Sequence, residues 1–114
     1  MKKVVIHIFH ADNSSLGTGS HVSERIRQVK NQHGVELEVY VFGPAERALD
    51  DPAHADYRQT LVSLVKAGVP VHICRDIAES MGKAQEFTEL GFTLEYARDA
   101  FVRYALEEAS VISF

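Results

Sequence analysis

Short apolar segments rich in β-branched residues alternate along the whole chain with longer amphipathic segments. This alternation constrains the fold more than any other feature of the sequence. The run from Val4 to Phe9 lacks the in-out pattern of a half-exposed strand, as expected for a parallel strand covered on both faces. Similar runs predict five strands in all, at residues 4–9, 37–42, 69–74, 92–96 and 109–114.

The segments between these runs have the spacing of helices. Val22, Ile26 and Val29 recur at i, i+4 and i+7 and form one apolar stripe. Ser20 can cap this helix and Gly34 can end it. Three further helices are predicted at about residues 57–65, 76–90 and 97–107, with a break in the middle of the second of these.

Strict strand–helix alternation with short connections predicts a parallel sheet with helices on both faces. The predicted fold class is therefore α/β, a three-layer α/β/α sandwich with a five-stranded, mostly parallel sheet. A length of 114 residues fits one domain, so residues 1–114 are expected to form a single domain. These patterns do not determine the strand order.

Charge and composition exclude several classes of partner. The twelve Lys and Arg residues are scattered and the net charge is −4, so no nucleic-acid partner is expected. The apolar run after Lys2 and Lys3 is shorter than the roughly 20 residues of a membrane span or the 7–15 of a signal peptide. One cysteine cannot form an internal disulfide. We therefore expect a cytoplasmic protein without a membrane partner.

The single cysteine, Cys74, is predicted at the carboxyl end of the third strand, where open α/β sheets bind ligands. The positive end of the following helix and the guanidinium of Arg75 can favour a thiolate there. Such a thiolate is a nucleophile that can carry a persulfide or form a mixed disulfide. Alternatively, Cys74 is a small buried apolar residue without chemistry of its own.

His10 ends the first strand at the same edge and is the candidate base for the Cys74 thiol. If the first and third strands are neighbours, the two side chains can come within hydrogen-bond reach. If the second strand lies between them, they are about 9.6 Å apart, two strand spacings, and direct activation fails. Asp12 and Glu46 are also predicted in loops at this edge, and they receive no role.

The segment 14–20 is predicted as a polar loop before the first helix, the position of a phosphate-binding loop. The candidate ligand-binding residues are Ser14, Ser15, Gly17 and Thr18, together with Gly43 after the second strand. The segment matches neither G-x-G-x-x-G nor a Walker A loop. The simpler interpretation is a flexible polar loop, and no cofactor is predicted.

The six histidines suggest a metal site as a further hypothesis. His72 and Cys74 share a face of the third strand and would supply two ligands, whereas zinc needs three or four. No other spacing completes the set, so no metal site is predicted. His7 and His72 are expected to be hydrogen-bonded within the sheet layer or to lie at a subunit interface.

The segment VPVHICRDIAESMG, from Val69 to Gly82, resembles the strand–cysteine–helix region of the DsrE/DsrF-like family. The opening KVVIHI and the turn VFGPA, followed by Leu49, are similar to that family as well. Its members are small cytoplasmic α/β proteins that assemble as trimers or hexamers, and several work in sulfur relay or sulfur oxidation. The resemblance implies that Cys74 carries sulfur as a persulfide, in a homotrimer or homohexamer that meets a sulfur donor or acceptor protein.

Two functional hypotheses follow. The first is a sulfur carrier or redox thiol; the alternative is a non-enzymatic small-molecule-binding or assembly module with an inert cysteine. Oligomers are expected on separate grounds, because the last helix is apolar around more of its circumference than one core face needs. The residues concerned are Phe101, Val102, Tyr104 and Leu106.

Overall fold

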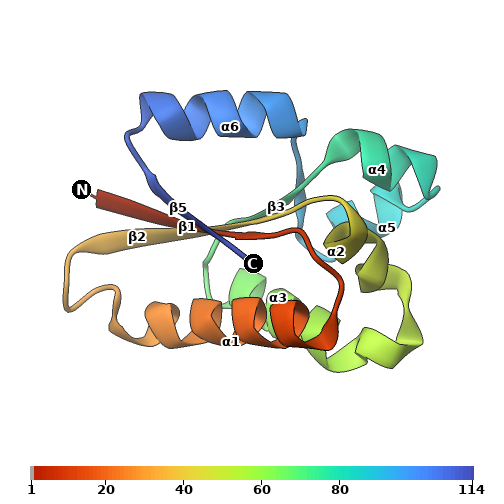
Figure 1. Ribbon diagram of the computed structural model, residues 1–114, viewed down its shortest axis with the longest axis horizontal. Helices are drawn as coiled ribbons and strands as arrows, with labels where there is room; N and C mark the ends of the chain where they lie inside the picture. Colours follow the sequence, from red (N-terminus) through yellow and green to blue (C-terminus); the bar gives the residue numbers. More distant parts are fainter. Residues whose placement is uncertain (1) are drawn as a thin grey trace.

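The computed structural model describes residues 2–114, which form a five-stranded, all-parallel sheet between layers of helices (Figure 1). The strands are β1 (Lys2–Ile8), β2 (Val35–Val41), β3 (Val71–Ile73), β4 (Thr93–Leu94) and β5 (Ser110–Ser113). Their spatial order is β4-β3-β2-β1-β5, and every neighbouring pair is parallel. The predicted three-layer α/β/α fold is confirmed.

The helices are α1 (Asn13–Val29), α2 (Pro44–Arg47), α3 (Ala55–Lys66), α4 (Arg75–Ser80), α5 (Ala84–Glu89) and α6 (Ala97–Leu106). The helices α1 and α3 lie together on one face of the sheet, and α6 crosses the other face (Figure 1). The short helices α2, α4 and α5 gather at the carboxyl end of the strands. None of the helices described is both long enough and apolar enough to cross a membrane.

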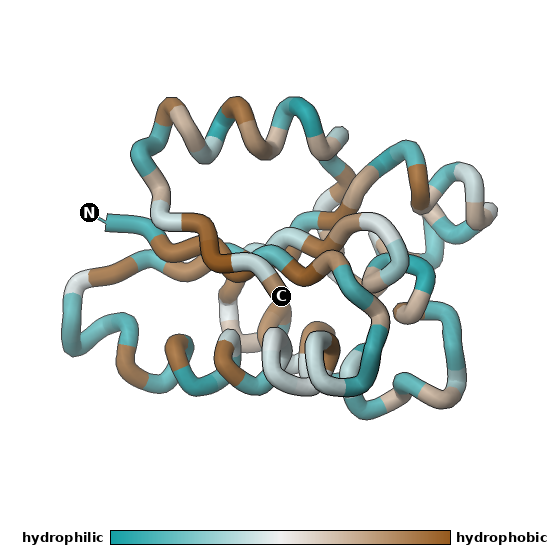
Figure 2. The backbone as a smooth tube through the Cα atoms, in the orientation of Figure 1, coloured by the Kyte–Doolittle hydropathy of each residue, from teal (hydrophilic) through white to brown (hydrophobic). Residues whose placement is uncertain are grey.

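The main core fills the space between the sheet and the pair α1 and α3. Ile6 and Ile8 of β1 and Val39 and Val41 of β2 point into it and are fully buried. Each such side chain contributes about 1.5–3 kcal/mol of burial free energy. Figure 2 shows the corresponding pattern, with hydrophobic stretches along the strands and alternating character along α1 and α6.

A smaller core lies under α6, on the opposite face of the same strands. Val5 and Tyr40 point up from the sheet, and Ala100 and Tyr104 point down from the helix. These residues are nearly fully buried. Because side chains along each strand point alternately to the two faces of the sheet, the strands contribute residues to two cores of unequal size.

The segment predicted as a polar loop, residues 14–20, is the first half of α1, so this prediction is wrong. The helix begins early because Asp12 caps it, accepting the backbone N–H of Ser15 at Oδ2 over 2.9 Å. Ser20, the predicted cap, lies inside the helix, where its hydroxyl donates to the Leu16 carbonyl at 2.7 Å. A polar composition is compatible with this helix because the hydroxyls of Ser20 and Ser23 bond back to its own backbone.

Gly19 has a packing role in α1. A Cβ at this position would lie 2.9 Å from Cγ1 of Ile8, closer than real side-chain contacts. The glycine therefore lets α1 lie directly against β1. Gly19 thus reflects close helix–sheet packing rather than loop flexibility.

The other predicted strands and helices are present, with ends that differ by a few residues. Gly34, Gly68 and Gly82, all at positive φ, lie in the turns that follow α1, α3 and α4. The break near Gly82 separates α4 from α5 as predicted. The segment between β2 and α3, for which no helix is predicted, forms α2 and two short 3-10 turns, Ala48–Asp50 and Pro52–His54.

Candidate functional site

Cys74 lies where its sequence position predicts, at the carboxyl end of β3. It is the N-cap residue of α4, which begins at Arg75. Only 4% of Cys74 is exposed. The thiol therefore lies at the ligand-binding edge of the fold but is covered in this conformation.

Glu46 on α2 contacts Cys74 directly. Its Oε1 accepts the backbone N–H of Cys74 at 2.9 Å. The residue is fully buried, and its second oxygen, Oε2, has no hydrogen-bond partner within residues 2–114. Burial raises the pKa of Glu46 to about 8, against the opposing effects of the Cys74 N–H, the Arg47 charge and the nearby N–H of Ala78. At neutral pH this side chain is mostly an uncharged acid.

Tyr40 of β2 completes the group. Its hydroxyl donates to the backbone carbonyl of Glu95 at 2.7 Å, and its ring is fully buried. Burial raises the pKa of Tyr40, and the neighbouring Cys74 and Glu46 raise it further, so the phenol stays protonated. We refer to Cys74, Glu46 and Tyr40 as the Cys74 cluster.

The structure does not bring His10 to Cys74. Because β2 lies between β1 and β3, the condition for direct activation of the thiol is not met. His10 is exposed, and its ring packs edge-on against Phe9 with the centroids 5.1 Å apart. Arg75, the other predicted partner of the thiol, is half-buried as the first residue of α4.

Four of the candidate ligand-binding residues lie in the first turns of α1 and not in a loop. They are Ser14, Ser15, Gly17 and Thr18. Ser15 is bound to Asp12 twice, since its hydroxyl also donates to Oδ1 at 2.8 Å. The carboxylate of Asp12 thus takes the place at the helix N-terminus that a phosphate would need. The segment considered for a phosphate-binding loop is therefore helical.

At Gly43, the fifth candidate ligand-binding residue, the backbone conformation requires a glycine. Its φ is +67°, and a Cβ there would collide with the ring of Phe9. The glycine turns the chain from β2 into α2 and so places Glu46 beside Cys74. It acts on the site through this turn.

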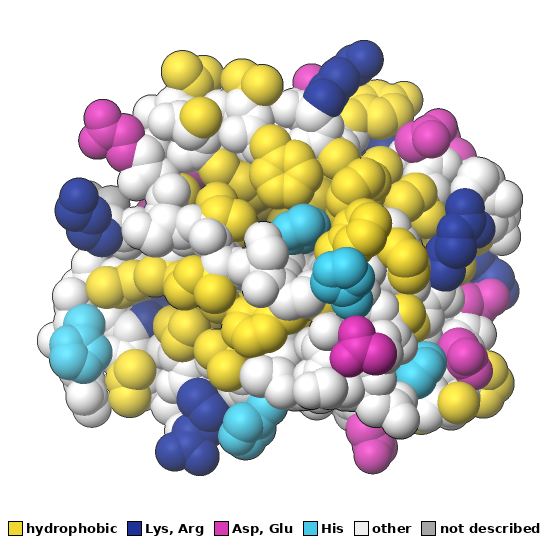
Figure 3. Space-filling view, in the orientation of Figure 1, with side chains coloured by type: hydrophobic (Ala, Val, Ile, Leu, Met, Phe, Trp, Pro, Cys, Tyr) yellow, Lys and Arg dark blue, Asp and Glu magenta, His cyan; other side chains and the backbone are white. Residues whose placement is uncertain are grey.

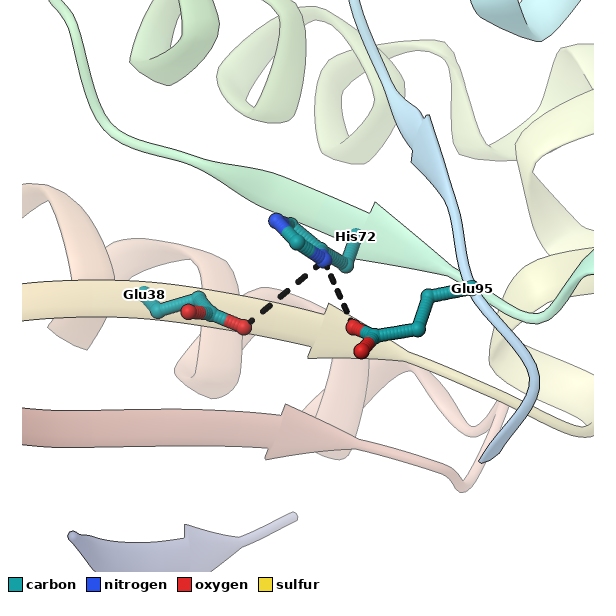
Figure 4. A group of neighbouring side chains, drawn as sticks. All are labelled: Glu38, His72 and Glu95. Carbon is teal, nitrogen blue, oxygen red and sulfur yellow. Dashed lines mark hydrogen bonds and ion pairs between the residues drawn. The ribbon is translucent and has the colours of Figure 1, made fainter. Parts of the chain in front are cut away.

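A second group of polar side chains lies beneath α6. Glu38 of β2, His72 of β3 and Glu95, which follows β4, point toward one another (Figure 4). His72 Nδ1 lies 2.8 Å from Oε1 of Glu95 and 3.9 Å from Oε2 of Glu38. The ligand atoms of all three lie within 4.8 Å of one another, close enough to surround a metal ion.

Arg103 of α6 already occupies the centre of this group. Its Nη2 lies 2.6 Å from Oε2 of Glu38 and 2.8 Å from Oε1 of Glu95. Glu38 also accepts the hydroxyl of Tyr104 and lies 3.2 Å from Lys3 Nζ. Because the guanidinium neutralises the carboxylates that a cation would need, the group is an ion-pair network that fastens α6 to the sheet.

The carboxylates of this network are held in the charged form. Burial alone would raise the pKa of Glu38, but hydrogen bonds from Arg103 and Tyr104, with His72 nearby, lower it to about 2. A hydrogen bond from Arg103 lowers the pKa of Glu95, helped by one from His72. Both groups are therefore ionised at neutral pH, unlike Glu46.

Neither Glu38 nor Glu46 is assigned a role from the sequence, although the sequence holds a signal for Glu38. Glu38 interrupts the apolar strand segment LEVYV. A charged residue in a buried strand requires a partner of opposite charge, so a distant Arg or Lys could have been sought. Glu46 carries no such signal, because the PAER segment after Gly43 looks exposed.

Three solved structures share this fold. A conserved protein of unknown function from Bacteroides thetaiotaomicron has a TM-score of 0.76 at 17% identity, covering 99% of this chain and 95% of that chain. The ychN protein from E. coli has a TM-score of 0.73 at 19% identity, with 100% of both chains covered. A protein of unknown function from Methanobacterium thermoautotrophicum has a TM-score of 0.71 at 19% identity, again with 100% of both chains covered.

At these identities the similarity is one of fold. No protein-family model matches the chain, and no curated protein matches its sequence. The fold and the site together define a class, a small three-layer α/β protein with a buried thiol beside a buried carboxyl group at the carboxyl end of its sheet.

Proposed function

We propose that the chain is a cytoplasmic sulfur-carrier or redox-thiol protein of the DsrE/DsrF-like kind, in which Cys74 accepts sulfur as a persulfide. The observation that carries this proposal is the placement of Cys74 at the end of β3, with its backbone N–H held by Glu46 at 2.9 Å. This edge of an open α/β sheet is the one at which ligands bind. The resemblance of the surrounding segment to the family supports the same role.

The proposed reaction is an exchange between a thiol and a persulfide. The Cys74 thiolate attacks the terminal sulfur of a persulfide carried by a donor protein. A new S–S bond forms on Cys74 while the S–S bond of the donor breaks. The donor leaves as a thiolate and takes up the proton that the Cys74 thiol lost, so no external oxidant or reductant is needed.

Access to the thiol involves the elements that follow it. The helices α4 and α5 have six residues each and are joined through Gly82 at positive φ. Helices this short are marginal by themselves and open at a lower free-energy cost than the core of a domain. We expect Cys74, 4% exposed in the closed state, to become reachable when α4 opens locally.

Persulfide loading tests the proposal. The folded protein and its C74S variant are incubated with a small-molecule persulfide, and their intact masses are measured. The wild type should gain one sulfur atom, and C74S, which lacks the single cysteine of the chain, should gain none. Lack of an adduct on the folded wild type, or an equal adduct on C74S, contradicts the proposal.

A second candidate function is favoured by the 4% exposure of Cys74. In this alternative the chain is a non-enzymatic small-molecule-binding or assembly module, and the thiol is an inert part of the interior. A thiol reagent separates the two functions. Reaction that is slow in the native protein and fast only after unfolding supports the inert cysteine and contradicts the sulfur carrier.

We also propose that the protein works as a homotrimer or homohexamer. On α6, Val102 is 60% exposed and Leu106 is 80% exposed; Val111 and Ile112 of β5 are exposed as well. Figure 3 shows hydrophobic side chains gathered on the face that includes β5 and the adjoining side of α6. Size-exclusion chromatography with light scattering should report the mass of three or six chains, and the mass of one chain would contradict the assembly.

A further inference from the structure

Glu46 is unusual among the buried polar side chains. Of the side chains that the structure describes, only Glu46 and His7 have a buried polar atom without a hydrogen-bond partner. A buried polar group in this state costs about 1–3 kcal/mol, and such groups are rare in native proteins. Glu46 is also the more deeply buried of the two, since none of its surface is exposed.

We propose that Glu46 is a positioning residue for the Cys74 thiol: it holds the cysteine backbone at the start of α4 and sets the charge that a thiolate meets. The inference rests on the proposed function in one respect, that Cys74 is the reactive group. The hydrogen bond from Cys74 N to Oε1, 2.9 Å long, makes the contact direct. The unpartnered Oε2 belongs to the same carboxyl group.

The backbone that carries Glu46 is held in place from two sides. The backbone N–H of Ala45 donates to the carbonyl of Phe9 at 2.9 Å, which ties α2 to the end of β1. The hydroxyl of Tyr57 on α3 donates to the carbonyl of Ala45 at 2.9 Å. These two bonds fix the backbone next to Glu46, and the hydrogen bond from the Cys74 N–H then orients its side chain.

The groups around Glu46 do not change charge near neutral pH, so beside the thiol Glu46 is the group of the cluster whose charge changes most. Tyr40 on β2 and Tyr57 on α3 are both buried, and burial raises the pKa of each phenol, with Glu46 adding to the effect. Both phenols are therefore neutral near neutral pH. Arg47 supplies the one positive charge found to act on the Glu46 carboxyl from the part of the chain described.

The charge state of Glu46 then decides how easily the thiolate forms. The neutral acid places no negative charge beside Cys74, whereas the carboxylate does, and like charges at close range oppose each other's ionisation. In an E46Q variant the amide oxygen can still accept the Cys74 N–H, but the group never becomes negative. The thiolate should therefore form at a lower pH in E46Q than in the wild type.

Ultraviolet titration of the thiolate measures this effect. The spectrum of C74S is subtracted from that of the wild type at each pH, and the spectrum of the E46Q and C74S double variant from that of E46Q. The subtraction removes the signal of the four tyrosines. The pH at which half of the thiol is ionised should be measurably lower in E46Q.

The matched control is E79Q, which removes the same charge from an exposed position on α4. Its titration should coincide with that of the wild type. Equal midpoints in the wild type and E46Q, or a shift in E79Q as large as that in E46Q, would overturn the inference.

A second measurement uses only the wild-type protein and so does not depend on a variant that folds. The carboxyl carbon of Glu46, followed by ¹³C NMR in the wild type, should titrate near pH 8 rather than near the ordinary 4.5. Titration at the ordinary value overturns the inference. The failures of the two proposals are also distinguishable: sulfur loading without a titration shift in E46Q contradicts only the role of Glu46, and a shift without loading contradicts only the sulfur carrier.

Discussion

Glu38 and Glu46 show how the surroundings of one residue type decide its chemistry. Glu38 is 2% exposed and Glu46 0%, so burial raises the pKa of both. Glu38 meets the guanidinium of Arg103 and the hydroxyl of Tyr104, which outweigh burial, whereas Glu46 accepts one backbone N–H. The first is therefore a permanent anion that holds α6, and the second is a carboxyl group that changes charge near neutral pH.

Removal of the Glu38 carboxylate should strongly destabilise the fold. In E38A, Arg103 and Lys3 lose their buried partner but keep Glu95 and Glu107, and the hydroxyl of Tyr104 loses its acceptor, so we expect a loss of about 1–3 kcal/mol. The matched control is E86A, which removes an exposed partner of Arg58 3.3 Å away and should cost less than about 1 kcal/mol. Urea unfolding measures both, and equal losses would show that the network does not stabilise α6.

At the scale of the element, α1 is the part of the fold that the sequence described least well. Asp12, assigned to a loop, is the N-cap, and the run rich in serine and glycine after it is helical. Two glycines within two residues gave the pattern of a flexible loop. Their environments differ, because a Cβ on Gly17 would meet nothing within 4 Å, whereas one on Gly19 would press on Ile8 at 2.9 Å.

Alanine should therefore be less well tolerated at position 19 than at position 17. G17A gains the higher helix propensity of alanine, about 1 kcal/mol, without a clash. G19A gains the same propensity but overpacks a buried isoleucine, which typically costs about 1–3 kcal/mol. Thermal unfolding should place G17A above the wild type and G19A below G17A. A G19A protein as stable as G17A would show that α1 can move away from β1 without cost.

The strands could be located from the sequence because each apolar run is longer than the error of one or two residues in its predicted ends. Sequence patterns did not locate the start of α1, since the reason for Gly19 is a contact with β1 that no local pattern records. The same holds for α2, whose four residues are too few for a helical period. Cys74 was placed correctly at its strand end, but its partner Glu46 comes from an element that the patterns did not show.

At the scale of the whole molecule, the two faces of the sheet are covered unequally. The helices α1 and α3 pack side by side on one face, and α6 alone crosses the other (Figure 1). Polar side chains thus enter the sheet layer on the α6 face, where Arg103 meets Glu38 and Glu95. The strand order that creates this arrangement could not be read from the sequence, since strand–helix alternation fits several parallel orders.

The stability of the molecule should depend on pH in a way that isolates Glu46. Folded Glu46 keeps its proton up to about pH 8, against 4.5 when unfolded, so its contribution is complete below 4.5 and is lost as the pH rises through 8. Between these values the free energy of unfolding falls by about 1.4 kcal/mol per pH unit from this group. Glu38 acts in the opposite sense, with stability present above 4.5 and lost as the pH falls through about 2.

Urea unfolding of the wild type and E46Q across this range gives the measurement. The difference between the two proteins should grow in favour of E46Q from about pH 5 to about pH 8, because Gln does not titrate. Other groups whose pKa values are shifted, such as His7, are present in both proteins and cancel in the comparison. Parallel curves would show that Glu46 is charged in the folded protein throughout.

The position of β1 between β2 and β5 also has a consequence for folding. Its residues pair with β2 nearby in the chain, Lys2 with Val35, and with β5 at the far end, Val4 with Ser110. Contacts between residues so distant in sequence form late, because closing long loops costs entropy and slows folding. Until β5 docks, β1 is an edge strand whose unpaired side is an open, apolar template for another chain. Aggregation during refolding should therefore be greatest for chains that have formed the β1–β2 pair and have not yet recovered their last strand.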